Sequence, residues 1–329
     1  MTVDYISYHV KMMPIQGIMG FGGGATGLGL VSGAAGTGLW TGSRGVFMGG
    51  WESVSNATSN DIEYITIDST GNVTDFGDLA AARQYMALTS DGSRGVAGGG
   101  FTSTNQIVYI TISTTGNSTA FGELTQARGG IAAVGDGQYG IFMGGNSGSV
   151  VDTIDYITVA TTGDATDFGN TTEAYEVAGP TNDATRGVTA GGNDSSDNRM
   201  TTMDYITMAT PGNASDFGDI SAIAYMGGCG SDVRGIFGGG HTGSGYSSAM
   251  YYITIQSLGN ASSFGSLSQA RFALAGCSNL SRGVFGGGKQ SSGASTDIID
   301  YITIASTGNA TDFGDLSDPR QGVGACSGT

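Results

Sequence analysis

Six copies of a tyrosine-led tetrad recur along this 329-residue chain. The tetrad is YITI, YITV or YITM, and successive tyrosines lie 45, 47, 49, 47 and 49 residues apart. The six tyrosines are Tyr64, Tyr109, Tyr156, Tyr205, Tyr252 and Tyr301. A period in the forties is typical of folds that repeat one supersecondary unit. The chain must therefore fold into six equivalent units.

Each period contains four short apolar stretches that turn-like segments separate. One stretch ends in a glycine cluster, as in RGVFGGG at residues 282–288, and the tetrad follows after a variable polar segment. A TGN-like turn, a Phe-Gly pair and a stretch such as RFALAGCS complete the period. The 61 glycines and the abundant Thr, Ser and Ile favour strands over helices. No helical periodicity follows the glycines, which argues against a phosphate-binding loop. The sequence predicts an all-β propeller with six four-stranded blades.

The C-terminus indicates how the ring closes. Cys229 and Cys277 each precede a repeat arginine by five residues, and Cys326 occupies the same repeat site close to the end of the chain. If residue 43 followed residue 329 directly, the spacing of the repeat would continue without a break. We expect residues 43–329 to form the propeller, with residues 321–328 as the innermost strand of the first blade. The segment GLGLVSGAAGTGL before Trp40 is an alternative source of that strand.

Residues 1–42 lie outside the predicted ring. We expect them to form an anchoring arm that packs on another protein, because methionine-rich segments adapt to varied surfaces. A degenerate seventh blade and a strand that covers one face of the ring are the alternatives. The anchoring residues are Tyr5, Tyr8, Met12, Met13, Ile15, Met19 and Phe21.

The charge balance argues against two classes of partner. The net charge is −16, and the chain has two lysines, so a nucleic acid would be repelled. We expect no membrane insertion, because no apolar run is long enough to span a bilayer. The first residues lack the basic start and apolar stretch of a secretory signal, and we expect synthesis in a cytosol.

Arginines and cysteines occupy fixed repeat sites, which favours structural roles. We expect the arginines to bond carbonyls or carboxylates such as Asp78, Glu123 and Asp315. The cysteines lie on neighbouring blades, too far apart for disulfides, and we expect small buried side chains, with a metal triad as the alternative. The arginine sites hold Arg44, Arg94, Arg186, Arg234 and Arg282, and Arg83, Arg128, Arg271 and Arg320.

The remaining polar groups give little support for catalysis. Carboxylates in the TDFGD pattern favour turn capping, with calcium binding as an alternative that needs more oxygen ligands. His9 and His241 are far apart in sequence, and no serine has an evident base. We expect no metal, no cofactor and no catalytic residue. A glycan hydrolase would need opposed carboxylates, and the sequence singles out no such pair.

The segments between the second and third strands differ from blade to blade. In a propeller these loops gather on one face, and divergent loops on a rigid scaffold commonly form recognition surfaces. Aromatic residues beside Asn and Asp suit carbohydrate binding. The candidate binding residues are Trp51, Phe101, Arg199, His241, Tyr246 and Lys289.

The order of features resembles the Kelch repeat, with Phe where Kelch usually has Trp. The sequence motifs of residues 44–329 are also similar to repeats in predicted structural proteins of marine tailed bacteriophages, cyanophages among them. These motifs are YITI, TGNATDFGDL and RGVFGGG. This resemblance implies a non-enzymatic virion protein, a phage tail or capsid fibre or decoration. Its partners would be other virion proteins, through the arm, and host-surface glycan. A secreted or surface bacterial lectin is the alternative, and homo-oligomerisation is left open.

Overall fold

The computed structural model describes residues 42–101 and 104–329. Within these ranges the chain contains 29 strands and no helix, which confirms the all-β prediction. The predicted arm residues and the alternative segment before Trp40 lie outside the described residues. Six sheets have four strands each, and every neighbouring pair of strands is antiparallel. We call these sheets blades 1 to 6 in chain order.

Each blade has one strand nearest the centre of the ring and three that follow outward, and its strands are named in that order. Blade 1 is β29 (Gly324–Gly328), β1 (Arg44–Met48), β4 (Asp61–Thr66) and β5 (Thr74–Asp78), and blade 2 is β6 (Ala87–Ser90), β7 (Arg94–Gly98), β8 (Gln106–Thr111) and β9 (Thr119–Glu123). Blade 3 is β10 (Ala132–Gly135), β11 (Tyr139–Met143), β12 (Thr153–Thr158) and β13 (Thr166–Asn170), and blade 4 is β14 (Gly179–Asn182), β15 (Arg186–Ala190), β16 (Thr202–Thr207) and β17 (Ser215–Asp219). Blade 5 is β18 (Gly227–Gly230), β19 (Arg234–Gly238), β20 (Ala249–Thr254) and β21 (Ser262–Ser266), and blade 6 is β23 (Ala275–Ser278), β24 (Arg282–Gly286), β26 (Ile298–Thr303) and β27 (Thr311–Asp315).

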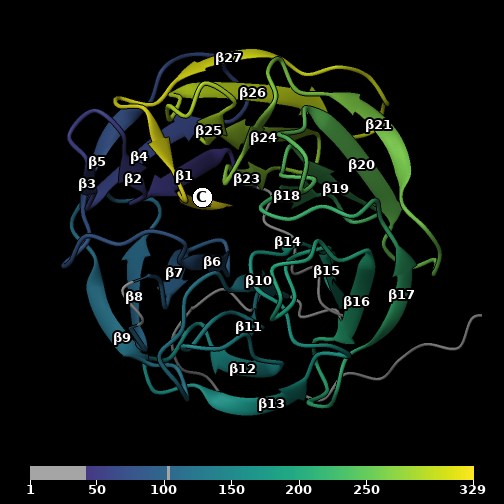
Figure 1. Cartoon of the computed structure of the whole chain (residues 1–329). Helices are drawn as coiled ribbons and strands as arrows, with labels where there is room; N and C mark the ends of the chain where they lie inside the picture. The colour runs from purple at the N-terminus through teal and green to yellow at the C-terminus, as the bar shows by residue number, and fades with distance from the viewer. Residues whose placement is uncertain (1–41, 102–103) are drawn as a thin grey trace, which may run out of the picture. The chain divides into compact units, whose positions relative to one another are not determined.

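The C-terminal strand completes the first blade, as the repeat register predicts. Strand β29 pairs with β1, and Val46 lies opposite Cys326. Each innermost strand contacts the innermost strands of both neighbouring blades, so the six blades close into a ring (Figure 1). The predicted strand at residues 321–328 is divided in two, because Gly322 has a positive φ that ends the extended run.

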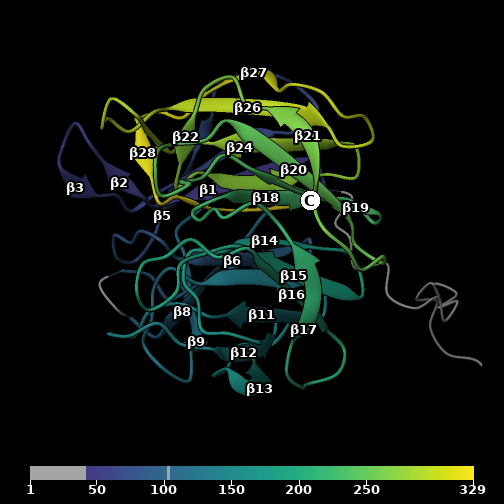
Figure 2. The same cartoon turned by 45° about the vertical axis from the view of Figure 1, so that its right-hand side comes forward.

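Five short strands add to the loops on one face of the ring. Strand β2 (Trp51–Glu52) lies between β28 (Arg320–Gln321) and β3 (Ala57–Thr58), and β22 (Arg271–Phe272) pairs with β25 (Lys289–Gln290). Figure 2 shows β2, β3 and β28 on the side of the blades away from the C-terminus. We call this the loop face, and we call the opposite side, where the tight turns and the closure between Ser43 and Thr329 lie, the turn face.

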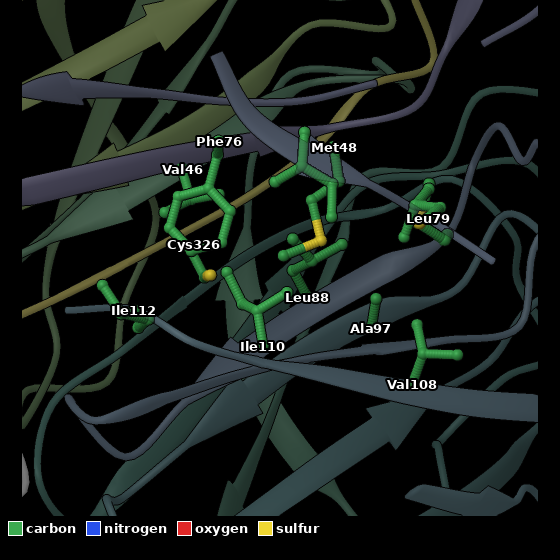
Figure 3. Packing of buried hydrophobic residues seen from close by; sticks show 12 residues of the cluster. Val46, Met48, Phe76, Leu79, Leu88, Ala97, Val108, Ile110, Ile112 and Cys326 are labelled. Atoms are coloured by element: carbon green, nitrogen blue, oxygen red, sulfur yellow. The ribbon is translucent and has the colours of Figure 1, made fainter. Parts of the chain in front are cut away.

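The apolar core lies between the blades. Alternate residues of each strand point to opposite sides of its sheet, so every blade buries both surfaces against its neighbours. The described residues form six clusters, one for each pair of adjacent blades. Between blades 1 and 2, Val46, Met48 and Phe76 pack against Leu88 and Ile110 (Figure 3). No blade can therefore keep its core without the next one.

The arginines that open the second strands join neighbouring blades. Each lies over the tetrad tyrosine of its own blade, with 4.4 to 4.7 Å between the guanidinium carbon and the ring centroid. Each also donates to a carbonyl of the next blade, as Arg282 does to Ile67 at 2.8 Å. The predicted bonds to carbonyls are confirmed. In blade 3 the site holds Tyr139, which contacts Tyr156 edge-on.

Three of the four arginines before the innermost strands form buried ion pairs within their own blades, whereas Arg83 donates to the carbonyl and the side-chain oxygen of Gln106. Arg128 pairs with Asp155, and Arg271 with Asp300, each at 2.9 Å and fully buried. Arg320 pairs with Glu63. The predicted partners Asp78, Glu123 and Asp315 are wrong, because the acids that face the arginines come from the third strand.

Blade 5 has apolar residues, Ile223 and Tyr251, at these same two sites. Both partners of the pair are therefore absent together in that blade. Blades 2 and 4 each keep one partner and bond it differently. Arg83 donates to Gln106, and Asp204 accepts the N–H and the hydroxyl of Thr172.

The glycine doublet after each second strand bends the chain toward the next blade. Gly239 and Gly240 have φ of 72° and 109°, which side chains resist. The second glycine of every doublet donates its N–H to a carbonyl of the next blade at 2.7 to 3.0 Å, as Gly240 does to Arg271. This explains why the cluster recurs six times.

The TGN turns fasten the rim of the ring. In blade 6, Gly308 and Ala310 donate N–H groups to Phe264 and Ser266 of blade 5, and Asn309 Oδ1 accepts the Ser266 N–H at 3.1 Å. Equivalent side-chain bonds of 2.9 to 3.1 Å occur at Asn72, Asn117, Asp164, Asn213 and Asn260. None of these residues has a positive φ. We call each such contact a rim clasp.

The rim clasp leaves no room for a side chain at the glycine of each Phe-Gly pair. A Cβ on Gly122 would collide with the carbonyl of Gly163 in the next blade, whereas a Cβ on Gly163 would meet nothing within 4 Å. Neither glycine has a positive φ, so the two positions differ only in the space available to a side chain. We expect Gly122→Ala to lower the free energy of unfolding by about 1–3 kcal/mol, and Gly163→Ala to lower it by much less. Urea denaturation measures the free energy of unfolding of both variants. An equal decrease in the two would show that the rim clasp can accommodate a side chain.

Candidate functional site

A ring of six backbone hydrogen bonds surrounds the axis at the loop face. One residue per blade lies just before the innermost strand with φ between 53° and 65°. Each donates its N–H to the carbonyl of its counterpart in the preceding blade, at 2.6 to 3.0 Å. The six residues, which we call the axial ring, are Gly322, Tyr85, Gly130, Val177, Tyr225 and Ala273. Four carry side chains in this conformation, which costs each roughly 1 kcal/mol or more.

Two tyrosines of the axial ring meet across the axis. Tyr85 belongs to blade 2 and Tyr225 to blade 5, half a turn apart, and their ring centroids lie 6.0 Å apart in an edge-on contact. The Tyr85 ring also covers Gly322, where a Cβ would lie 2.9 Å from it. Beneath the two rings lies a mainly apolar cavity of about 100 Å³. Burial raises the pKa of both phenols, which therefore stay protonated. The tyrosines close the central channel at this face.

A second circle of residues surrounds the axial ring. The first loop residue of each blade pairs with the residue that precedes the axial ring, as Trp51 does with Gln321 and Phe101 with Gln84. Asn146, Asn193, His241 and Lys289 occupy the same place in the other blades. Arg199 and Tyr246 pair with Asn193 and His241. The six predicted loop residues therefore belong to one face: Trp51, Phe101, Arg199, His241, Tyr246 and Lys289.

Six half-buried rings form a line across the loop face, which we call the aromatic line. Successive centroids lie 5.1, 6.0, 5.3, 4.7 and 5.3 Å apart. Three of its members are predicted loop residues, whereas Tyr85, Tyr225 and Phe272 are not. Trp51 and Lys289 make none of these ring contacts. The order along the line is Phe101, Tyr85, Tyr225, Phe272, Tyr246 and His241.

Sequence reasoning missed the three central rings because they stand directly after the repeat-arginine sites, in segments that lead into a strand. The sequence signal that could have identified two of them, Tyr85 and Tyr225, is the variation at their repeat position. At the axial-ring position the blades carry Gly, Tyr, Gly, Val, Tyr and Ala, which is unusual for a site under strict conformational demand.

Arg199 holds two loops together beside the aromatic line. Its Nη1 donates to Asn193 Oδ1 at 2.6 Å and pairs with Asp197 at 3.0 Å. Its Nη2 lies 3.0 Å from His241 Nδ1, which also accepts the N–H of Gly243. Since Nδ1 accepts from both groups, the neutral ring carries its proton on Nε2. The guanidinium also approaches the Tyr225 ring, at 5.9 Å from the centroid.

The pKa of His241 lies below its usual 6.5, first because of burial and second because of the Arg199 charge, against a smaller opposing effect of Asp197. The contribution of neutral His241 to the free energy of unfolding is complete above pH 6.5. It is lost as the pH falls through the pKa of the folded state, which is lower than 6.5. We expect a midpoint below 6.5 when the ring protons are titrated by NMR, with His9→Gln used for assignment. Arg199→Met should raise the midpoint, because it removes the nearby positive charge. A wild-type midpoint at or above 6.5 would show that neither burial nor the Arg199 charge governs this ring.

The other predicted chemical groups lie away from the loop face. Cys229, Cys277 and Cys326 are free and buried on innermost strands, against glycines of the next blade. Burial raises the pKa of Cys326 to about 12, so this thiol stays protonated. The TDFGD carboxylates lie on the outermost strands.

Across residues 42–101 and 104–329, no three His, Cys, Asp or Glu side chains cluster as metal ligands. No helix in the part of the chain that the structure covers is long and apolar enough to cross a membrane.

Comparison with known proteins leaves the family open. No family model and no curated protein matches this chain. The geometry of the loop face is therefore the main basis for a functional proposal.

Proposed function

We propose that this chain is a non-enzymatic binding protein of a bacteriophage particle, and that its loop face binds a glycan on the host surface. The observation that carries the proposal is the aromatic line. Six half-buried rings in mutual contact present the apolar faces on which the C–H groups of sugars stack, and Glu176 and Gln321 lie in the circle of residues around them. Stacking and hydrogen bonding suffice for binding and need no reacting group.

The strain in the axial ring supports the same face. Tyr85 and Tyr225 adopt a backbone conformation that glycine fills in blades 1 and 3. Strained residues cluster at functional sites, where the surrounding structure holds them in place. Two bulky aromatics at such positions are accounted for if their side chains are needed at the axis.

The virion assignment rests on the repeat sequences, which are similar to those of structural proteins of marine tailed bacteriophages and also resemble Kelch repeats. The described chain begins at Gly42, beside Gly328 on the turn face. We propose that the predicted arm residues serve as an anchor to other virion proteins.

Replacement of one central tyrosine tests glycan binding. Tyr225→Gly introduces the residue that the positive φ of this position favours, so the variant should fold. It also removes a ring from the middle of the aromatic line. We expect it to lose most of the binding that the wild type shows on a glycan array, because the stacking surface is interrupted. Val177→Gly is the matched control, since it changes the same repeat position outside the line. Equal binding by all three proteins would exclude the loop face as the site.

Location tests the virion assignment separately. Mass spectrometry of purified phage particles should detect the chain in stoichiometric amounts. Its absence from particles, together with its presence on a bacterial surface or in the medium, would favour the alternative of a bacterial lectin with the same binding face.

A further inference from the structure

Two side-chain oxygens of the loop face are buried without a hydrogen-bond donor among the described residues. They are Oε2 of Glu176 and Oε1 of Gln321. The other such atoms belong to the buried arginines and to Asp300 inside the blades. A buried acceptor without a donor typically costs about 1–3 kcal/mol. Native proteins have few such groups, so each one calls for an explanation.

The two acceptors occupy the same repeat position in opposite blades. Gln321 precedes Gly322 in blade 1, and Glu176 precedes Val177 in blade 4. The tyrosine pair joins blades 2 and 5 across the axis. One acceptor therefore lies on each side of the pair. Glu176 is near enough to raise the pKa of both tyrosines, and Gly322 lies under the Tyr85 ring.

We propose that the ligand is a neutral, hydroxyl-rich sugar that stacks on Tyr85 and Tyr225 and donates hydroxyl hydrogen bonds to Glu176 and Gln321. This inference rests on the proposed glycan function and names the class of glycan. Sugar hydroxyls are donors that match two acceptors, whereas sulfate and carboxylate groups offer only acceptors. Glu176 would also repel an anionic sugar when ionised.

The nearby arginine does not change this preference. The guanidinium of Arg199 is engaged by Asn193, Asp197 and His241, and its side chain is 12% exposed. It is therefore poorly placed to bind an acidic sugar. Lys289 is on another blade and pairs with Phe272 through the backbone.

Glu176 and Gln321 are each only partly buried as residues, although the two unpartnered oxygens are covered. Binding as proposed therefore requires each carboxylate or amide group to turn about the last carbon–carbon bond of its side chain, so that an oxygen faces the ligand. Burial raises the pKa of Glu176, and a side-chain hydrogen bond with Asn146 opposes this rise. A hydroxyl donor from the sugar would favour the ionised form in the same way.

The test compares Gln321→Leu and Glu176→Leu with Gln84→Leu, which changes the equivalent position in blade 2. The probes are a panel of neutral, sialylated, sulfated and deacetylated amino oligosaccharides, followed by calorimetric titration of the strongest neutral binder. We expect wild-type binding to favour neutral sugars. Gln321→Leu and Glu176→Leu should each weaken it about tenfold, and Gln84→Leu by less than about twofold. The Tm of Gln321→Leu should equal or exceed that of the wild type, because the unsatisfied acceptor is gone.

Several results would overturn the inference. A preference for anionic or amino sugars would identify the wrong ligand class. Wild-type affinity in both Gln321→Leu and Glu176→Leu would show that the two acceptors do not contact the sugar. If these variants bind normally while Tyr225→Gly does not, the inference fails and the proposed function stands. If the wild type binds no sugar of the panel, both fail.

Discussion

Backbone hydrogen bonds that pass from one blade to the next hold this structure together. They form three concentric circuits: the axial ring, the bonds from the glycine doublets, and the rim clasps. A four-stranded sheet with two apolar surfaces cannot bury those surfaces by itself. The circuits fix the spacing at which neighbouring sheets bury those surfaces, and β29 is needed because it completes the last of the six contacts.

The same circuits explain why the candidate site lies at the axis. The axial ring requires a positive φ in every blade, and its side chains converge there. Glycine, alanine or valine occupies the position in four blades, and tyrosine occupies it in the other two. The contact between the two tyrosines closes the channel and turns the centre of the loop face into a platform. The loops contribute Phe101, Tyr246 and the Arg199–His241 contact around it.

The sequence is sufficient to predict the blades and their closure, because both follow from periodic spacing. The tetrad period gives the number of sheets, and Cys326 gives the register of the last strand. It is not sufficient to predict contacts between blades. The Asn309 bond to Ser266 and the convergence of Tyr85 with Tyr225 join residues that are distant in sequence. The predicted arginine partners are wrong for the same reason. Glu123 is close to Arg128 in sequence, whereas Asp155, which pairs with Arg128, is brought to it by the sheet from the third strand.

The rim clasps also determine how such a protein behaves when many copies are crowded together. A sheet with a bare outer strand offers a template on which other chains add strands, and this leads to aggregation. Here the last strand of every blade already bonds the turn of its neighbour, as Phe264 bonds Gly308. Combined with the mutual repulsion that a net charge of −16 causes, this opposes edge-to-edge association between copies.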